Sequence, residues 1–478
     1  MEMRQQGINA TNRRHFLIIC FPVQGHINPS LQLAKTLAHG GAKVTFTTTG
    51  RGLQRVHETL PSLNGLSYVS FYDGLDPESA DGFSSFMADL MKAGSENLLK
   101  ILEKFVEMGQ KVDCLVYSFL LPWAARVARA VKVPSAFLSI QCATAFSIYH
   151  RFFNGHDGIY NVNGGIIDEL QTSVSVKIPQ LPLFSATDLP TFLLPDDPLN
   201  TFMIPLMQEH IQELENDAEP CVFVNTFEEL EEDAVRTLKD KMNLIAVGPL
   251  IPSAFTRGDV NGSTEKSYGA DLFHKNDDYF QWLDDKDEHS VIYISFGSIV
   301  VLKKEQKEEI LQGLREIKRP FLWVIRLTDR EQEYIHKSLE HEVKNGDGLI
   351  VPWCSQMEVL AHKSIGCFVT HCGWNSTLES LFSGVPMIGC PHFSDQTTNA
   401  KMVEEVWGTG VRARVNGEVV IGRDEFKRCL EMVMGDGERG REIRYHCKKW
   451  RGLAMEVVKE GGSTNKNLKC VVDGNYKV

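Results

Sequence analysis

The sequence predicts an α/β protein made of two doubly wound parallel-sheet domains that face a cleft. Short apolar runs alternate with amphipathic helical segments in two blocks, and a polar stretch rich in Gly and Ser separates the blocks. This alternation favours parallel sheets, because a crossover helix returns the chain to begin each strand in the same direction. Ligands of such sheets bind beyond the carboxyl ends of the strands, so the cleft is the expected site.

The first block, residues 1–250, opens on the apolar run 15–21, which predicts a buried strand. Asn28 and Pro29 then have the pattern of a helix N-cap followed by proline at the first helical position. This helix is predicted to end at Gly40. Further strands are predicted at residues 43–48, 114–119, 134–140, 221–225 and 244–250.

The second block, residues 286–455, repeats the alternation. Its apolar runs predict strands at residues 290–298, 321–326, 348–351, 366–371 and 386–391. Residues 251–285 lack any period, and we expect an exposed interdomain linker there. The polar residues 456–478 form a tail that is expected to pack back on the first domain.

Composition narrows the class of protein. Of the 478 residues, 43% are hydrophobic and 23% are charged, which is typical of a globular protein. The net charge of −12 argues against a nucleic-acid partner, because phosphate neutralisation requires a basic face. No apolar run approaches the ~18 residues that span a bilayer, and the N-terminus lacks the apolar core of a signal peptide. Scattered cysteines favour reduced thiols, so we expect a cytoplasmic protein. We also expect a monomer.

Residues 353–396 bring together groups suited to a nucleotide, its phosphates and a sugar. Within this segment His371 ends an apolar strand, and Gly373 leads into a short helix that carries Asn375 and Ser376. A helix N-terminus presents unpaired N–H groups and a positive dipole end, which together hold phosphate without a metal. The segment therefore predicts a phosphate site at the start of this helix.

Single residues of this segment also have purely structural interpretations. Ser376 and Glu379 have the spacing of a capping box, which would only complete a helix end. A tryptophan placed like Trp353 is more often a core residue, and Asp395 is equally typical of an N-cap. Their order and spacing together favour a nucleotide-sugar site.

This segment resembles the signature box of plant UDP-glycosyltransferases. The resemblance covers nearly the whole chain, and it includes FPVQGHINP near the start, VNTFEELE at 224–231, WLD at 282–284 and SFGS at 295–298. It implies the GT-B fold of two Rossmann-like domains, and inverting sugar transfer from a UDP-sugar to a small acceptor without a metal or other cofactor. In this family glutamine at the end of the box accompanies glucose, so UDP-glucose is the expected co-substrate.

The resemblance also implies a role for each residue of the donor site. Trp353 would stack on uracil, Gln356 would lie near the base and ribose, and Glu379 would bind ribose hydroxyls. The residues expected at the diphosphate are Ser298, His371, Asn375 and Ser376. The residues expected at the sugar are Trp374, Asp395 and Gln396. The UDP-sugar-binding set is completed by Cys354 and Gly373.

His26 follows the first strand in a turn that faces the cleft, and the resemblance aligns it with the general base. A neutral imidazole with a pKa of about 6.5 can take a proton from an acceptor hydroxyl, although a loop histidine alone is more often structural. The family commonly orients this histidine with an aspartate, and Ser118 stands at that position. A hydroxyl fixes a tautomer but cannot offset imidazolium charge. For this catalytic pair, either another group compensates for the missing charge, or the acceptor is acidic enough to need less help from the base, as phenols and carboxylic acids are.

The predicted function is transfer of glucose from UDP-glucose to a phenolic or flavonoid hydroxyl, or to a carboxyl, of a small plant metabolite or hormone. Residues 181–195 and the Ser118 region resemble the branch that contains anthocyanin 5-O-glucosyltransferases and enzymes acting on crocetin or indole-acetate. Two alternatives remain open: a UDP-sugar epimerase of the same fold, and a non-catalytic small-molecule binder. No metal site is expected, because Asp285-Lys-Asp287 lies in polar sequence and the Cys and His residues at 354–372 lack paired spacing.

Overall fold

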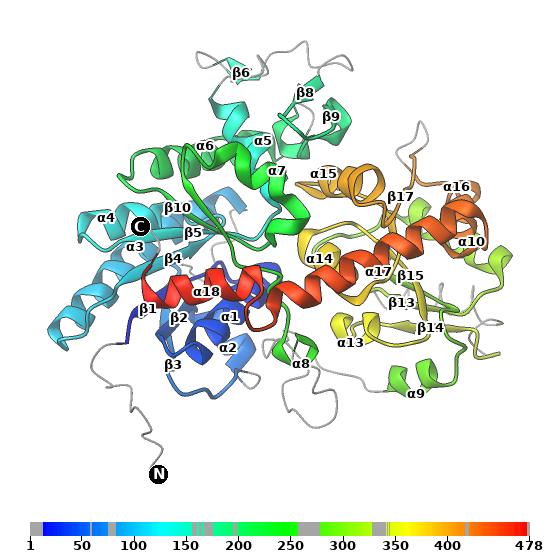
Figure 1. The fold of residues 1–478 in the computed structure, drawn as a ribbon, viewed down its shortest axis with the longest axis horizontal. Helices are drawn as coiled ribbons and strands as arrows, with labels where there is room; N and C mark the ends of the chain where they lie inside the picture. The colour runs from blue at the N-terminus through cyan, green and yellow to red at the C-terminus, as the bar shows by residue number, and fades with distance from the viewer. Residues whose placement is uncertain are drawn as a thin grey trace.

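The computed structural model of the chain describes residues 13–57, 60–74, 83–154, 160–161, 165–166, 175–194, 197, 199–256, 278–326, 341, 343, 345–415 and 420–475. Two parallel sheets, each flanked by helices, form two halves that lie side by side (Figure 1). The prediction of two doubly wound sheets is confirmed.

The first sheet has seven strands in the order β11-β10-β5-β4-β1-β2-β3, and all neighbours are parallel. Its strands are β1 His15–Ile19, β2 Lys43–Thr49, β3 Leu66–Phe71, β4 Cys114–Ser118, β5 Ser135–Ser139, β10 Cys221–Val224 and β11 Asn243–Ala246. The strand order reverses between β1 and β4. A ligand is therefore expected beyond the carboxyl ends of these two strands, where His26 and Ser118 are found.

The second sheet has six parallel strands in the order β14-β13-β12-β15-β16-β17. Its strands are β12 Val291–Ser295, β13 Phe321–Val324, β14 Gly348–Val351, β15 Ile365–Thr370, β16 Met387–Gly389 and β17 Gly410–Arg412. The short β17 was not predicted. The order reverses between β12 and β15, whose carboxyl ends lead to Ser298 and His371.

Helices connect the strands in both halves. Those of the first half are α1 Gln24–His39, α2 Gly50–Val56, α3 Phe83–Glu107, α4 Trp123–Ala130, α5 Ala143–Phe153, α6 Asn200–Glu215, α7 Glu228–Leu238 and α8 Ser253–Thr256. Those of the second half are α9 Asp278–Asp284, α10 Lys304–Ile317, α13 Gln356–Leu360, α14 Trp374–Ser383, α15 Gln396–Lys401, the π-helix η5 Met402–Val406, α16 Arg423–Met434, α17 Glu438–Val458 and α18 Ser463–Asp473.

Small elements formed by the described residues between 160 and 194 lie at the top of the view in Figure 1. The antiparallel pairs are β6 Tyr160–Asn161 with β7 Gly165–Ile166 and β8 Ser175–Lys177 with β9 Leu183–Ser185. Two short 3-10 helices follow, η3 Ala186–Asp188 and η4 Thr191–Leu193.

Helix α1 begins at Gln24, so the predicted start at Asn28 with Pro29 in the first helical position is wrong. Proline inside a helix removes the N–H that would bond to the carbonyl four residues earlier, here that of Gly25. The amide of Asn375 in the second half donates to this carbonyl at 2.9 Å. A contact between the two halves thus supplies the donor that Pro29 lacks. Because the helix begins at Gln24, His26 lies in its first turn.

The contacts of the helices α9 and α18 show where the second half of the chain begins and where its C-terminal helix packs. Tyr279 and Leu283 of α9 pack in a core cluster with β12 and β15, so the predicted linker end at residue 285 lies one helix too late. The last helix α18 lies against α1 and β11 of the first half (Figure 1). There Thr464 donates to the Gly248 carbonyl, and Asn467 donates to the Ala246 carbonyl at 3.0 Å.

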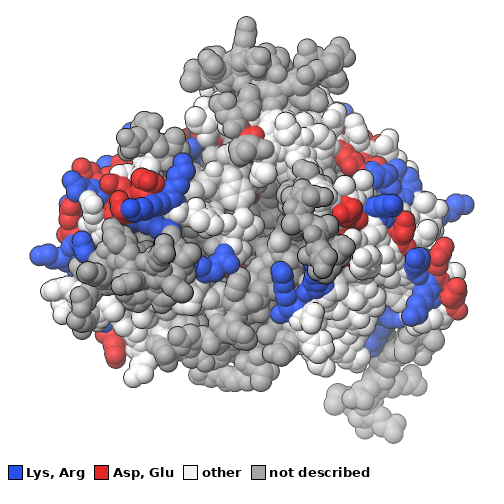
Figure 2. Space-filling model, turned by 180° about the vertical axis from the view of Figure 1, so that it is seen from behind, with Lys and Arg blue, Asp and Glu red and all other residues white. Residues whose placement is uncertain are grey.

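Two surface features bear on partners. Among the described residues, no helix is long and apolar enough to cross a membrane. On the face drawn in Figure 2, the described residues show basic and acidic side chains mixed at both flanks, with further basic side chains near the middle.

Candidate active site

A cavity of about 640 Å³ lies between the two sheets at their carboxyl ends. Every residue predicted for the site lines it except Ser118. The lining members of the predicted set are His26, Ser298, Trp353, Cys354, Gln356, His371, Gly373, Trp374, Asn375, Ser376, Glu379, Asp395 and Gln396. The tertiary structure therefore brings residues from both halves to one space.

Ser118 lies behind His26 rather than in the cavity. Its Oγ is 3.5 Å from His26 Nδ1, at the outer limit of a hydrogen bond, and it accepts the Phe21 N–H at 3.1 Å. The hydroxyl can also donate to the Phe119 carbonyl at 3.4 Å. Ser118 is thus a weak partner of the imidazole, and its main bonds are to the backbone.

His26 is neutral at ordinary pH. Burial lowers the pKa of His26 to about 3, and a hydrogen bond to the Phe119 carbonyl opposes part of the shift. The rings of Phe21 and Phe119 lie beside the imidazole at centroid distances of 5.3 and 6.2 Å. A neutral imidazole that donates to this carbonyl keeps its second nitrogen unprotonated, as a general base requires.

The turn that carries Ser118 and Phe119 is held by a histidine that the sequence did not indicate. Leu120 has a φ of 75°, which is unfavourable for a leucine. Its N–H donates to Nε2 of the fully buried His210 in α6 at 3.2 Å, and the His210 ring stacks on Phe119. Burial lowers the pKa of His210 to about 3, so this ring is neutral and can accept the bond.

On the donor side, Gln356 connects three predicted residues. Its amide donates to Ser376 Oγ and Glu379 Oε2, both at 2.8 Å, and its carbonyl accepts the Tyr293 hydroxyl at 3.2 Å. Helix α14 has Gly373 at its N-cap, so Ser376 lies inside the first turn. The capping-box interpretation of Ser376 and Glu379 is therefore wrong.

His371 lies between two glycines at the start of α14. A Cβ on Gly297 would be 2.8 Å from the His371 ring, and a Cβ on Gly373 would be 2.5 Å from its Nε2. Gly297 also has a φ of 74°, which favours glycine. Burial, with the nearby His392, lowers the pKa of His371 to about 3. Its buried Nδ1 has no hydrogen-bond partner within the described residues, so this neutral ring has an uncommitted nitrogen.

The two predicted tryptophans differ in their surroundings. Trp353 is half-buried on the cavity wall, and it does not have the burial of a core residue. The Trp374 indole donates to the Asn225 carbonyl of the first half at 2.6 Å and packs against Trp407. Its indole N–H is therefore taken up by a contact between the halves. Cys354 is buried, with its sulfur 3.4 Å from the Tyr293 hydroxyl.

Asp395 and Gln396 lie at the start of α15. Asp395 occupies the N-cap position, but its side chain makes no capping bond and instead accepts from Asn399 at 2.8 Å. Burial raises the pKa of Asp395, and bonds from Asn399 and Gln141 partly oppose this. The Gln396 side-chain carbonyl accepts the N–H groups of His392 and Phe393, which leaves its amide N–H₂ for other partners.

The wall contributed by the first half is mostly apolar, and the sequence did not identify its individual residues. The apolar members are Phe21, Val23, Phe119, Leu120, Ile140, Phe192, Leu199 and Met203. Gln141 is a polar member, and its amide donates to Ser394 Oγ across the cleft at 3.0 Å. No cluster of three or more potential metal ligands occurs among the residues that the structure describes.

A cleft between two parallel sheets, with a helix N-terminus on one side and a neutral histidine on the other, suits a nucleotide-sugar-dependent transferase. Residues 201–440 match the family described as UDP-glucoronosyl and UDP-glucosyl transferase. UDP-glycosyltransferase 75C1 of Solanum lycopersicum is 47% identical, over 96% of this chain and 98% of that relative. The chain therefore belongs to this family and is a UDP-glycosyltransferase.

Further comparisons agree with the predicted branch and fold. The crocetin glucosyltransferase of Gardenia jasminoides is 44% identical, over 96% of this chain and 97% of that relative. The anthocyanidin 3-O-glucoside 5-O-glucosyltransferase of Verbena hybrida is also 44% identical, over 97% and 99%. The structure of Os79 from O. sativa in complex with UDP aligns with a TM-score of 0.81 and 31% identity, covering 96% of this chain and all of that one.

These findings confirm the GT-B fold, the use of a UDP-sugar and the small-molecule acceptor. The epimerase alternative finds no support, and the relatives are named as enzymes rather than as non-catalytic binders.

Proposed function

We propose that this enzyme transfers glucose from UDP-glucose to a phenolic hydroxyl of a small plant metabolite, with inversion and without a metal. One observation carries the proposal: His26 and the predicted donor residues line one cavity from opposite halves of the molecule. The names of relatives that act on an anthocyanidin glucoside and on crocetin support a small plant metabolite as the acceptor.

The reaction is a single displacement. The acceptor oxygen attacks the anomeric carbon while the bond from that carbon to the β-phosphate oxygen breaks. The acceptor proton passes to the unprotonated nitrogen of His26, and UDP leaves with the electron pair. His371, Asn375 and the N-terminus of α14 would stabilise the charge that develops on the diphosphate.

The other donor roles follow the predicted order. Trp353 would stack on uracil, while Gln356 and Glu379 would hold the ribose, a role that fits their shared hydrogen bond. Asp395 and the free amide of Gln396 would bind the sugar hydroxyls. Trp374 would contribute its backbone rather than its indole N–H, because that N–H bonds to Asn225.

The cavity supports a neutral aromatic acceptor over a carboxylate. Among its described lining residues the only Lys or Arg is Arg326, which follows β13 on the donor side. The described part of the acceptor wall thus offers a carboxylate no cation, while its aromatic rings suit a flat phenol. Ester formation on a carboxyl group is the second candidate, and the similarity to a crocetin glucosyltransferase favours it.

An acceptor screen with UDP-glucose tests this assignment. We expect kcat/KM for flavonoid phenols to exceed that for simple aliphatic alcohols by at least about 100-fold, because a weakly basic imidazole needs an acidic proton. Product mass identifies each glucoside. Equal rates for alcohols and phenols would contradict the proposed dependence on acceptor acidity.

The pH profile tests the state of His26. The unprotonated base is the active form, so activity is present above its pKa and lost as pH falls through it. Because burial lowers the pKa of His26 to about 3, kcat/KM should stay flat from about pH 8 to about pH 5. An acid limb near the ordinary histidine pKa of about 6.5 would show that the ring is not desolvated in this way.

Ser118→Asp provides the contrast, since it places a carboxylate beside Nδ1. This variant should raise the pKa of His26, shift the acid limb to higher pH and improve slow alcohol acceptors relative to phenols. A profile and acceptor preference identical to those of the wild type would show that Ser118 does not control the base.

We also propose that the enzyme is a cytoplasmic monomer. All eleven cysteines are free and all except Cys470 are buried, which supports a reducing compartment. Light scattering should give a mass near 53.8 kDa. A fluorescent fusion that accumulates in chloroplasts would contradict the cytoplasmic assignment.

A further inference from the structure

The loop of residues 185–194, which we call the clasp loop, lies along the start of α15. Two hydrogen bonds join the clasp loop to Ser394, the residue before Asp395. The Ser394 N–H donates to Thr191 Oγ1 at 2.9 Å, and the Thr191 N–H donates to the Ser394 carbonyl at 2.9 Å. The clasp loop belongs to the first half, so these bonds cross the cleft.

Two further bonds join the clasp loop to the residues that follow Gln396. Thr397 donates its hydroxyl to the Leu189 carbonyl at 2.6 Å, and Thr398 donates to the Asp188 carbonyl at 2.7 Å. The sugar-binding pair of residues 395–396 is therefore held on both sides by one loop of the other half.

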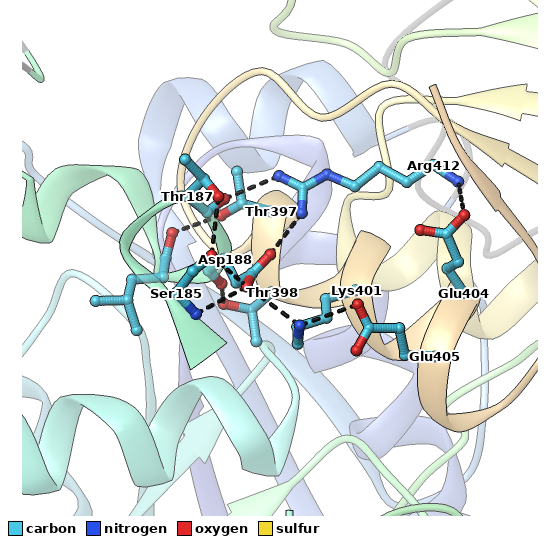
Figure 3. Close-up of polar contacts among 10 residues, drawn as sticks. Ser185, Thr187, Asp188, Thr397, Thr398, Lys401, Glu404, Glu405 and Arg412 are labelled. Carbon is cyan, nitrogen blue, oxygen red and sulfur yellow. Dashed lines mark hydrogen bonds and ion pairs between the residues drawn. The ribbon is translucent and has the colours of Figure 1, made fainter. Parts of the chain in front are cut away.

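A buried charge cluster fixes the clasp loop to the second half. Figure 3 shows Arg412 and Lys401 pointing at the Asp188 carboxylate, at 2.7 and 3.2 Å. Arg412 also donates to the Thr187 carbonyl at 2.8 Å. Burial raises the pKa of Asp188, but bonds from Ser185 and Arg412 and the charge of Lys401 outweigh this and lower it. Asp188 thus remains ionised between two cations.

The clasp loop also reaches the acceptor wall. Phe192 lines the cavity and stacks on Tyr149 at a centroid distance of 5.4 Å. A single short loop therefore contacts both the space for the acceptor and the segment that carries the sugar-binding pair.

We propose that Asp188 and Thr191 are positioning residues for the donor sugar, because they hold Asp395 and Gln396 in place from the acceptor-binding half. Recognition of the sugar then requires both halves, whereas recognition of UDP requires the second half. The inference rests on the proposed function, in which residues 395 and 396 bind the sugar.

The test compares UDP-glucose with UDP, which lacks the sugar. Asp188→Asn removes the charge, and Thr191→Val removes the acceptor of the Ser394 N–H at nearly constant volume. Each variant should weaken UDP-glucose binding about tenfold, a typical strength of coupling between sites, and leave the Kd for UDP within about twofold. Discrimination against UDP-galactose should fall as well. Isothermal titration measures all three ligands.

Asp113→Asn is the matched control, since Asp113 accepts the His15 N–H at the opposite end of the first sheet. It should change neither Kd. Equal losses for UDP and UDP-glucose in the clasp-loop variants would overturn the proposal, because they would indicate general damage to the cleft. Unchanged UDP-glucose binding would overturn it too.

Asp395→Ala and Gln396→Ala separate this inference from the proposed function. If both retain wild-type affinity for UDP-glucose, the assignment of the sugar site fails. If they lose that affinity while Asp188→Asn and Thr191→Val keep it, the assignment stands and only the role of the clasp loop is overturned.

Discussion

Replacing His26 with alanine should lower kcat/KM for a phenolic acceptor by roughly 10²- to 10⁴-fold, the usual contribution of a general base. Among the described residues, Ser118 offers no replacement for this base, because it lies behind the ring, outside the cavity lining, and bonds to the backbone. The Kd for UDP-glucose should stay unchanged, since the proposed donor contacts come from the other half. Initial rates of glucoside formation and titration with UDP-glucose measure the two quantities.

His39→Ala is a suitable control, because His39 is exposed at the far end of the same helix α1. It should leave both quantities near wild type. If His26→Ala kept more than about a tenth of the activity, the acceptor proton would have to leave by another route.

His371→Ala should lower kcat by roughly 10²- to 10³-fold, comparable to the loss of one preorganised donor to a developing anion. The ring is neutral, buried and held between Gly297 and Gly373 at the start of α14, so its N–H needs little reorganisation to reach the diphosphate. Stabilisation should grow as UDP leaves, so kcat should fall more than the affinity for UDP. Steady-state kinetics and UDP titration separate these effects.

His362→Ala supplies the control, because His362 bonds to Asp284 and Ser364 outside the cavity lining. It should retain full activity. If His371→Ala lowered only the affinity for UDP and left kcat unchanged, the prediction would be wrong. His371 would then contribute to ground-state binding of the donor rather than to the transition state.

The donor half of the site could be predicted because one continuous segment carries it. Within residues 353–396, the ends of the strands, the start of the helix and the polar residues follow each other along the chain. Their spacing in the sequence was therefore enough to predict that they lie close together. The structure removes the remaining ambiguity for Ser376 and Asp395, whose side chains bond to Gln356 and Asn399 rather than cap their helices.

The acceptor half could not be predicted, because its contacts join distant segments. In the first turn of α1, Asn375 of the other half donates to the carbonyl that Pro29 leaves without a helical donor. Similarly, nothing in the sequence distinguishes His210 and Asp188 from other polar residues. Only the tertiary structure brings His210 to Leu120 and Asp188 to Arg412. Sequence patterns over a few neighbouring residues cannot predict partners that lie far away along the chain.

The most direct measurement uses NMR to determine the anomeric configuration and the yield of the product formed from UDP-glucose and a phenolic acceptor. Inverting transfer with His26 as base predicts a β-glucoside and UDP in equal amounts, no UDP release without acceptor, and formation of both products slowed by at least about 100-fold with His26→Ala. An α-glucoside, or UDP released at the same rate without acceptor, would contradict the proposed reaction.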